Sequence, residues 1–179
     1  MSTPQIGKLA MEPAKDRPDL LAAPVRAALA QHPDLTAHVA EIDPELADTA
    51  EFCRAYDVPL DASANCVVVS GKRGGETRIA ACMVLATMRA DVNNTVRRQL
   101  DVRKASFLPM DDAVAATGME YGGITPLGLP DEWPILVDPA VADLAHAVIG
   151  SGVRRSKLAV AGADLAAWPG AIVVDGLGK

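Results

Sequence analysis

The segment TGMEYGGITPLGLP, residues 117–130, holds the least helical run of the chain, GGITPLG at residues 122–128. Glycine costs about 1 kcal/mol and proline about 3 kcal/mol at a helix-interior position, so no helix passes through this run. The glycine pair permits positive φ and close approach of another group, and Pro126 restricts Thr125 to extended geometry. We therefore predict a stiff loop with bare backbone N–H groups that can hold an oxyanion, a carboxylate or a phosphate. A tight connection, with glycines for steric reasons alone, is the alternative.

Length and composition around this loop indicate one folded unit. The chain has 179 residues, the size of one domain, and half of them are hydrophobic, which is ample for one core. Residues 1–17 carry prolines and mixed charge without periodicity. We expect them to be a flexible N-terminal arm, followed by a single domain at residues 18–179.

Charge and composition exclude several classes of function. The net charge of −6 disfavours broad adhesion to DNA or to an acidic membrane, and only 3% of residues are aromatic, too few for a general single-strand binder. The three cysteines have no CxxC spacing and the three histidines no metal-ligand spacing, so we expect no metal and no other cofactor. No signal peptide and no membrane-length apolar run is evident, so the sequence predicts a cytoplasmic protein.

Strand and helix signals alternate along the chain. The segment 71–76, GKRGGE, resembles a phosphate cradle but lacks a following Ser or Thr and a helix start, so we predict a plain hairpin there. Because hairpins occur among interleaved strands and helices, a mixed sheet is favoured over a purely parallel one. Helices are predicted at 20–30 (beginning or kinked at Pro24), 48–56 (capped by Asp48 or Thr49), 91–100 (capped by Asp91), 111–116 (capped by Asp111 or Asp112 and ended by Gly118) and 163–168. Strands are predicted at 36–42, 64–70, 77–85, 103–107, 133–138, 145–149, 158–161 and 171–174.

Three segments together resemble a known family. They are the loop at 117–130, PILVDPAV at 134–141 and AVIGSGVRRSKLAVAGADLAAW at 147–168. This pattern is similar to that of the YbaK/prolyl-tRNA synthetase editing domain family, small deacylases that remove wrong amino acids from tRNA. The likeness spans roughly residues 35–176. It implies an α+β fold with a mixed, partly barrel-like β-sheet flanked by helices, and a site without a metal.

The resemblance also implies site residues. The loop facing the aminoacyl ester is formed by Gly122 and Gly123, with catalytic roles, and by Thr125, Pro126 and Gly128, which bind substrate. The pocket wall is shaped by Asp138 and by the segment Gly150, Ser151 and Gly152.

Two positions depart from the family pattern. Family members carry a lysine just before the first core strand, where this chain has Asn65. Asparagine supplies no charge to a phosphate or a developing oxyanion, yet its position makes it a candidate catalytic residue. Further along, Arg155 stands where the family has glycine, and Lys157 follows. Lys157 is a candidate substrate-binding residue that restores a cation near the site; an exposed, solvated lysine is the alternative.

Two functions follow from the resemblance. The first is trans-acting hydrolysis of a mischarged aminoacyl-tRNA, with the tRNA acceptor end and an aminoacyl-tRNA synthetase as partners. The second is a catalytically weakened or inactive domain that binds a small amino-acid-like ligand or an aminoacyl-tRNA end. A purely structural partner protein is what remains if neither holds.

Overall fold

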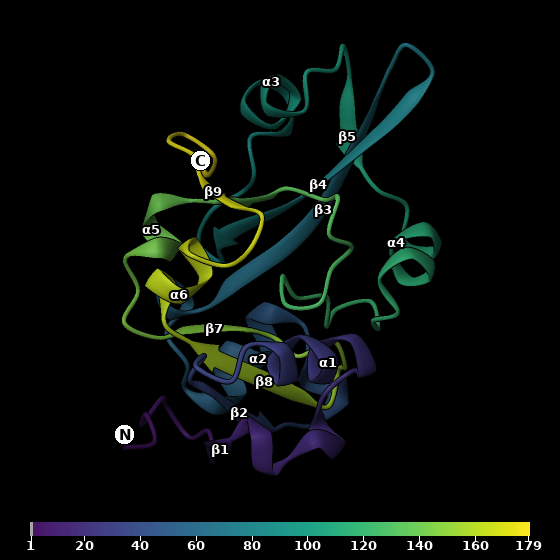
Figure 1. Ribbon diagram of the computed structural model, residues 1–179. Coiled ribbons are helices and arrows are strands. Elements are labelled where there is room, and N and C mark those ends of the chain that lie inside the picture. Colours follow the sequence, from purple (N-terminus) through teal and green to yellow (C-terminus); the bar gives the residue numbers. More distant parts are fainter. Residues whose placement is uncertain (1) are drawn as a thin grey trace.

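Two β-sheets form the centre of the molecule in the computed structural model, which describes residues 2–179 (Figure 1). The first is antiparallel, in the order β1-β2-β8-β7; the second is mixed, in the order β5-β3-β4-β6-β9. The strands are β1 Glu12–Pro13, β2 Ala37–Glu41, β3 Ala64–Arg73, β4 Glu76–Leu85, β5 Ala105–Phe107, β6 Ile135–Val137, β7 Ala147–Gly150, β8 Ser156–Val160 and β9 Ala171–Val173. The α+β class and the mixed sheet are confirmed, with the strands divided between two sheets.

Short helices surround the sheets. The α-helices are α1 Ala23–Gln31, α2 Thr49–Tyr56, α3 Arg97–Leu100, α4 Met110–Thr117, α5 Pro139–Ala142 and α6 Gly162–Ala166. A π-helical turn, η5 Val92–Val96, precedes α3, and 3₁₀ turns are η1 Ala14–Asp16, η2 Pro18–Leu20, η3 Pro44–Leu46 and η4 Leu60–Ala62. Among residues 2–179, no helix has the length and apolarity needed to cross a membrane.

The long β3–β4 hairpin connects the two halves of the molecule (Figure 1). The strands pair antiparallel from Ala64 opposite Leu85 to Arg73 opposite Glu76, and Gly74 and Gly75 make the turn with φ of 57° and 81°. Positive φ at both turn positions matches the right-handed twist of the flanking strands. The segment 71–76 is therefore the predicted hairpin and not a phosphate cradle.

Helix boundaries follow local signals in most places. Pro24 lies in the first turn of α1, so the helix begins there and is not kinked. Gly118 ends α4 with φ of 66°, as predicted. The predicted cap of α4 was wrong, because Pro109 occupies the N-cap and Asp111 and Asp112 lie in the first turn. The helix predicted at 91–100 is capped by the Asp91 side chain but begins as a π-helical turn.

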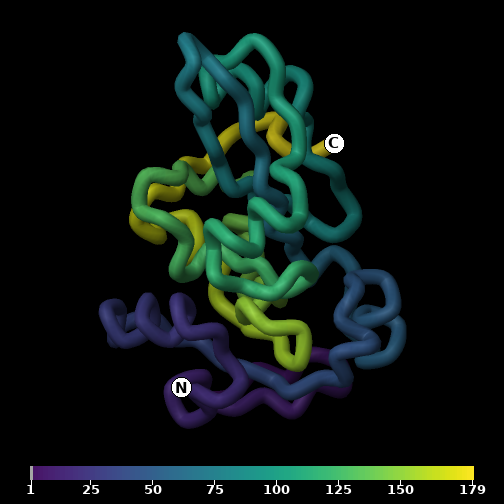
Figure 2. The backbone as a smooth tube through the Cα atoms, turned by 90° about the vertical axis from the view of Figure 1, so that its right-hand side faces the viewer, coloured from purple at the N-terminus to yellow at the C-terminus, as the bar shows by residue number. Residues whose placement is uncertain are grey.

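Residues 2–17 differ from the predicted flexible arm. Strand β1 pairs with β2, and Ile6 and Leu9 are buried beside Phe52 in one of the hydrophobic clusters. Burial of each such side chain contributes roughly 1.5–3 kcal/mol, which offsets the entropy lost on ordering the segment. Figure 2 shows the N-terminal segment lying along the lower part of the molecule, far from the C-terminus.

The two sheets meet at the beginning of β3. Ser63, just before that strand, forms a parallel bridge with Val148 of β7. The main hydrophobic cluster takes Ala64 and Val68 from β3 together with Ile149 and Leu158 from the other sheet. A residue at the start of β3 thus lies between both sheets, where segments distant in sequence converge.

Candidate functional site

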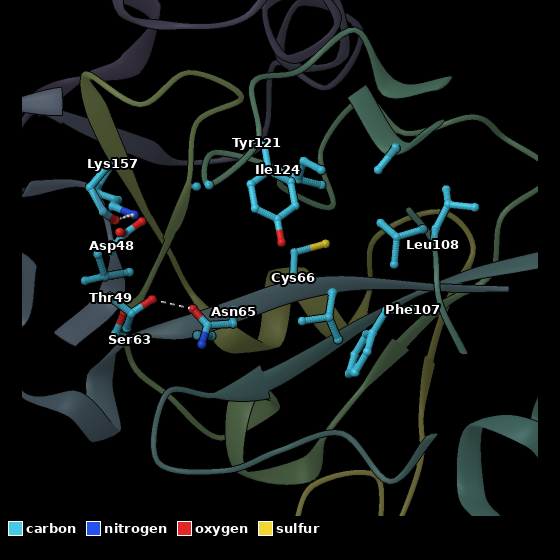
Figure 3. A pocket seen from close by; sticks show the side chains of 18 residues that line it. Asp48, Thr49, Ser63, Asn65, Cys66, Phe107, Leu108, Tyr121, Ile124 and Lys157 are labelled. Carbon is cyan, nitrogen blue, oxygen red and sulfur yellow. Dashed lines mark hydrogen bonds between the residues drawn. The ribbon is translucent and has the colours of Figure 1, made fainter. Parts of the chain in front are cut away.

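A cavity of about 300 Å³ lies at this junction of the sheets. Its walls come from the beginning of β3, the beginning of α2, the segment after β5, the loop after α4, and strands β7 and β8. Four of the predicted site residues line it: Asn65, Gly122, Gly150 and Lys157. Figure 3 shows Lys157, Asp48, Thr49 and Asn65 on one side of the cavity and Phe107 and Leu108 on the other.

Asn65, the second residue of β3, is held in place by α2. Its Oδ1 accepts a hydrogen bond from the hydroxyl of Thr49, the first residue of that helix, at 2.8 Å (Figure 3). Within residues 2–179 the Asn65 Nδ2 group has no hydrogen-bond partner. The fixed amide therefore keeps free donors next to the cavity.

Lys157 is buried, so it is not the exposed, solvated lysine that was the alternative interpretation of the sequence. It lies in the middle strand of the antiparallel sheet, opposite Ala40 of β2 and Gly150 of β7, and its side chain packs on the same face as Phe52 of α2. Its Nζ donates to the carbonyl oxygen of Ala47 at 3.1 Å and lies 5.1 Å from the centre of the Phe52 ring. Burial lowers the pKa of this ammonium from its ordinary value.

The two glycines of the predicted loop have different environments. Gly122 has φ of 87° and lines the cavity, and within the described chain its amide donates no hydrogen bond. The Gly123 amide, predicted to be bare, instead donates to the carbonyl oxygen of Glu120 at 3.0 Å. A Cβ on Gly123 would lie 2.8 Å from the carbonyl oxygen of Val153, so this glycine permits a close backbone approach.

The segment 150–153 is the backbone that packs against the loop at 120–123. Gly152 donates to the Gly123 carbonyl at 2.7 Å, and the Glu120 amide donates to the Gly152 carbonyl at 2.8 Å. A Cβ on Gly150 would lie 2.4 Å from the Gly123 carbonyl oxygen. The glycines of both segments thus allow two irregular backbones to pair beside the cavity.

Ser151 and Gly152 do not line the cavity. The buried Ser151 hydroxyl bonds to the carbonyl oxygens of Val153 and Ser156 at 3.1 and 3.2 Å. Gly152 packs against Ala22, whose side chain leaves no room for a Cβ. Both stabilise the turn between β7 and β8.

Four more predicted site residues also lie outside the cavity. Thr125 is fully buried, and its hydroxyl has no hydrogen-bond partner within residues 2–179. Pro126 and Gly128 line a separate hollow beside α1. Asp138 caps α5 through the Ala140 amide at 2.8 Å and accepts from the Gly178 amide at 2.8 Å, so its carboxylate is occupied structurally.

Arg154 ties the loop to the beginning of α2. Its Nη1 lies 3.5 Å from Asp48 Oδ1 and 3.4 Å from the Tyr121 carbonyl oxygen, and its Nη2 donates to the Pro44 carbonyl at 3.2 Å. An exposed ion pair of this kind contributes at most about 1 kcal/mol. Its main effect is positional, since it holds Gly122 across from α2.

Several lining residues were missed by the sequence interpretation. Phe107 and Tyr121 are 61% and 55% exposed at the cavity, and exposure of an aromatic ring cannot be read from local sequence. Cys66 also lines the cavity, but burial raises the pKa of its thiol well above the ordinary value, so it is not a thiolate nucleophile near neutral pH. Thr49 was predicted only as a helix cap.

No cluster for a metal exists in the described chain: within residues 2–179, no three His, Cys, Asp or Glu side chains come together as ligands. The cavity is lined mostly by neutral side chains, with Lys157 as its basic group and Asp48 as its acidic group, and these are suited to hydrogen bonding and charge stabilisation of a polar substrate.

Comparison with known proteins gives the family. A model of the aminoacyl-tRNA editing domain matches residues 43–167, well over half of the chain. The chain belongs to this family. The resemblance read from the sequence is confirmed, and membership implies aminoacyl-tRNA as the substrate of editing.

Solved structures show the same fold. One is a hypothetical protein with a TM-score of 0.76 and 17% identity, matched over 87% of this chain and 99% of that one. A second, described as a candidate trans-editing enzyme for prolyl tRNA synthetase, has a TM-score of 0.71 and 20% identity over 87% of this chain and 97% of that one. A third, from a study of computational epitope grafting onto scaffold proteins, has a TM-score of 0.70 and 21% identity over 85% of this chain and 93% of that one.

Proposed function

We propose that this protein hydrolyses, in trans and in the cytoplasm, the ester between a mischarged amino acid and its tRNA. One observation carries the proposal: Asn65, Gly122 and Lys157, which are far apart in sequence, line the same cavity in a chain that belongs to the editing family. An aminoacyl-tRNA synthetase is a second partner in this proposal, because it produces the charged tRNA.

The chemistry is addition of water to an ester. Water, assisted by the neighbouring ribose hydroxyl, attacks the carbonyl carbon; the bond to the ribose oxygen then breaks, leaving a free amino acid and a tRNA with both terminal hydroxyls. The Gly122 amide, which has no partner within residues 2–179, donates to the developing oxyanion. One such donor lowers the barrier by roughly 3–4 kcal/mol. Asn65 orients the attacking water by donating from Nδ2 to its oxygen.

The volume of the cavity and the aromatic rings at its edge suit the aminoacylated acceptor end of a tRNA. About 300 Å³ accommodates a small aminoacyl group. The exposed rings of Phe107 and Tyr121 at the cavity offer a stacking surface for the terminal base, and stacking of a base on an aromatic ring is worth roughly 1–3 kcal/mol. This mode of contact needs no large basic surface, so the net charge of −6 does not oppose it.

Release of amino acid from mischarged tRNA tests the proposal. The purified protein is incubated with a panel of correctly charged and mischarged tRNAs, including Ala- and Cys-charged tRNA-Pro, and the loss of ester is followed. Hydrolysis of at least one mischarged species above the spontaneous rate is expected. Folded protein that releases no amino acid from any of them refutes the proposal.

A binding protein on the same scaffold is the second candidate. The observation in its favour is that Asn65 stands where the family pattern has lysine and that its Oδ1 is already bonded to Thr49. A thermal-shift screen with amino acids and non-hydrolysable aminoacyl-adenosine analogues separates the two candidates. A ligand at 100 times its Kd adds about 2.7 kcal/mol of stability, so binding without turnover is readily seen.

A further inference from the structure

Lys157 is a buried cation whose donors are mostly unused. The residue is 8% exposed, and Nζ donates to the Ala47 carbonyl oxygen at 3.1 Å. An ammonium has three N–H donors, so two of them lack a protein acceptor within residues 2–179. Within that range no carboxylate lies at salt-bridge distance from it.

The ionisable groups near Lys157 do not neutralise its charge. Asp48 influences Lys157 electrostatically, but its side chain is 71% exposed and makes its own contact with Arg154 at 3.5 Å. Cys53 is a buried thiol whose pKa is raised by burial, so it is neutral near pH 7. Arg154 carries the same sign as Lys157 and opposes it.

An unpaired buried charge is costly unless a ligand completes its coordination. A solvated lysine at the protein surface would avoid that cost, but this one faces a cavity next to neutral donors. Among the residues that line the cavity, Lys157 is the one basic side chain, and the one acidic side chain, Asp48, is at the exposed edge. The interior of the cavity therefore has an excess of positive charge and of hydrogen-bond donors.

We propose that Lys157, together with the Nδ2 donors of Asn65, which Thr49 holds in place, forms an anion subsite that binds an oxyanion group of the substrate. Two parts of an aminoacyl-tRNA end carry such a group: the side-chain carboxylate of an acidic amino acid, and the phosphate that links the last two nucleotides. The identity of the ligand rests on the proposed function, whereas the preference for an anion rests on the geometry of Lys157 alone. A basic aminoacyl side chain is excluded by the same charge.

Matched pairs of non-hydrolysable probes distinguish the two sources. The first pair is the amide-linked 3′-aspartyl and 3′-asparaginyl derivatives of 3′-amino-3′-deoxyadenosine, which differ in one charge at nearly constant shape. The second pair is the 3′-alanyl derivative with and without a 5′-phosphate. Binding is measured by calorimetry with the wild-type protein, Lys157→Met, and Lys72→Met as the control, because Lys72 is exposed on the hairpin.

In the wild type, the anionic member of one pair is expected to bind about ten-fold or more tightly than its neutral counterpart, since a hydrogen bond to a charged group is worth this much. Lys157→Met is expected to abolish the preference and Lys72→Met to retain it. The pair that discriminates identifies the anion as the side chain or the phosphate. Should Lys157→Met not fold, Lys157→Gln serves as the neutral variant.

The proposal is overturned if neither pair discriminates in the wild type, or if the preference survives neutralisation of Lys157. These outcomes are separate from hydrolysis. A protein that prefers the anionic probe but releases no amino acid from any tRNA retains the anion subsite and loses the deacylase function.

Discussion

Replacement of Lys157 by methionine is expected to stabilise the protein while removing its anion preference. Transfer of an ammonium from water to a protein interior costs several kcal/mol, and here a single hydrogen bond to Ala47 and the contact with Phe52 offset it. Methionine fills similar volume and makes a favourable sulfur–aromatic contact of about 0.3–1.5 kcal/mol with the same ring. The Ala47 carbonyl loses its donor, which opposes the gain.

We therefore expect a gain of about 1–2 kcal/mol in the free energy of unfolding, at the low end of the roughly 1–4 kcal/mol found when buried ionic groups are replaced. Urea denaturation at pH 7 measures it. With a slope of about 2 kcal/mol per molar urea, the midpoint rises by roughly 0.5–1 M. Lys72→Met, at an exposed position, is expected to stay within about 0.5 kcal/mol of wild type.

The pH dependence gives an independent check. Burial lowers the folded-state pKa of Lys157 below its ordinary value of 10.5, so over the interval between the two values the unfolded chain binds the proton and the folded chain does not. Below the folded-state pKa, the buried ammonium therefore lowers the stability of the wild type by its full amount. This destabilisation decreases as the pH rises from the folded-state pKa toward 10.5. Since methionine does not titrate, the advantage of Lys157→Met should narrow over that interval.

A variant that is less stable than wild type at pH 7 by more than about 1 kcal/mol would refute the reasoning, because Lys157 would then contribute net stability through its contacts. An advantage that widens with pH would contradict the lowered pKa. Either result removes the reason to expect a ligand for this ammonium.

Three other predictions concern the cavity and its loop. Asn65→Lys is expected to raise the deacylation rate, because it supplies the cation that the family pattern has at this position; an unchanged or lower rate contradicts this. Gly122→Ala and Gly74→Ala both force alanine into positive φ, which should lower the stability of each variant by about 1–2 kcal/mol. Only Gly122→Ala should lower the deacylation rate, because Gly74 faces open space at the hairpin. Equal rates for the two variants would argue against a role for the loop. Thr125→Val should raise the free energy of unfolding by about 1–3 kcal/mol, measured by thermal unfolding, because it removes a buried hydroxyl without a partner in the described chain. A lower melting temperature than wild type would indicate that the Thr125 hydroxyl bonds to a water molecule.

Local sequence determined most of the secondary structure. The proline and glycine content of residues 117–130 excluded a helix there, Pro24 set the beginning of α1, and the glycines at 74 and 75 made the hairpin. These features depend on backbone dihedrals and on hydrogen bonds between near neighbours, which short sequence patterns encode. The family resemblance added the α+β fold.

Tertiary structure alone decided which groups reach the cavity. Strand alternation places Leu158 on one face of β8 and Lys157 on the other, but that second face is buried only because α2 packs Phe52 against it. In the same way, the Gly123 carbonyl oxygen is occupied by the amide of Gly152, a residue distant in sequence. Burial and partner choice are set by contacts between segments far apart in the chain, and no local pattern specifies them.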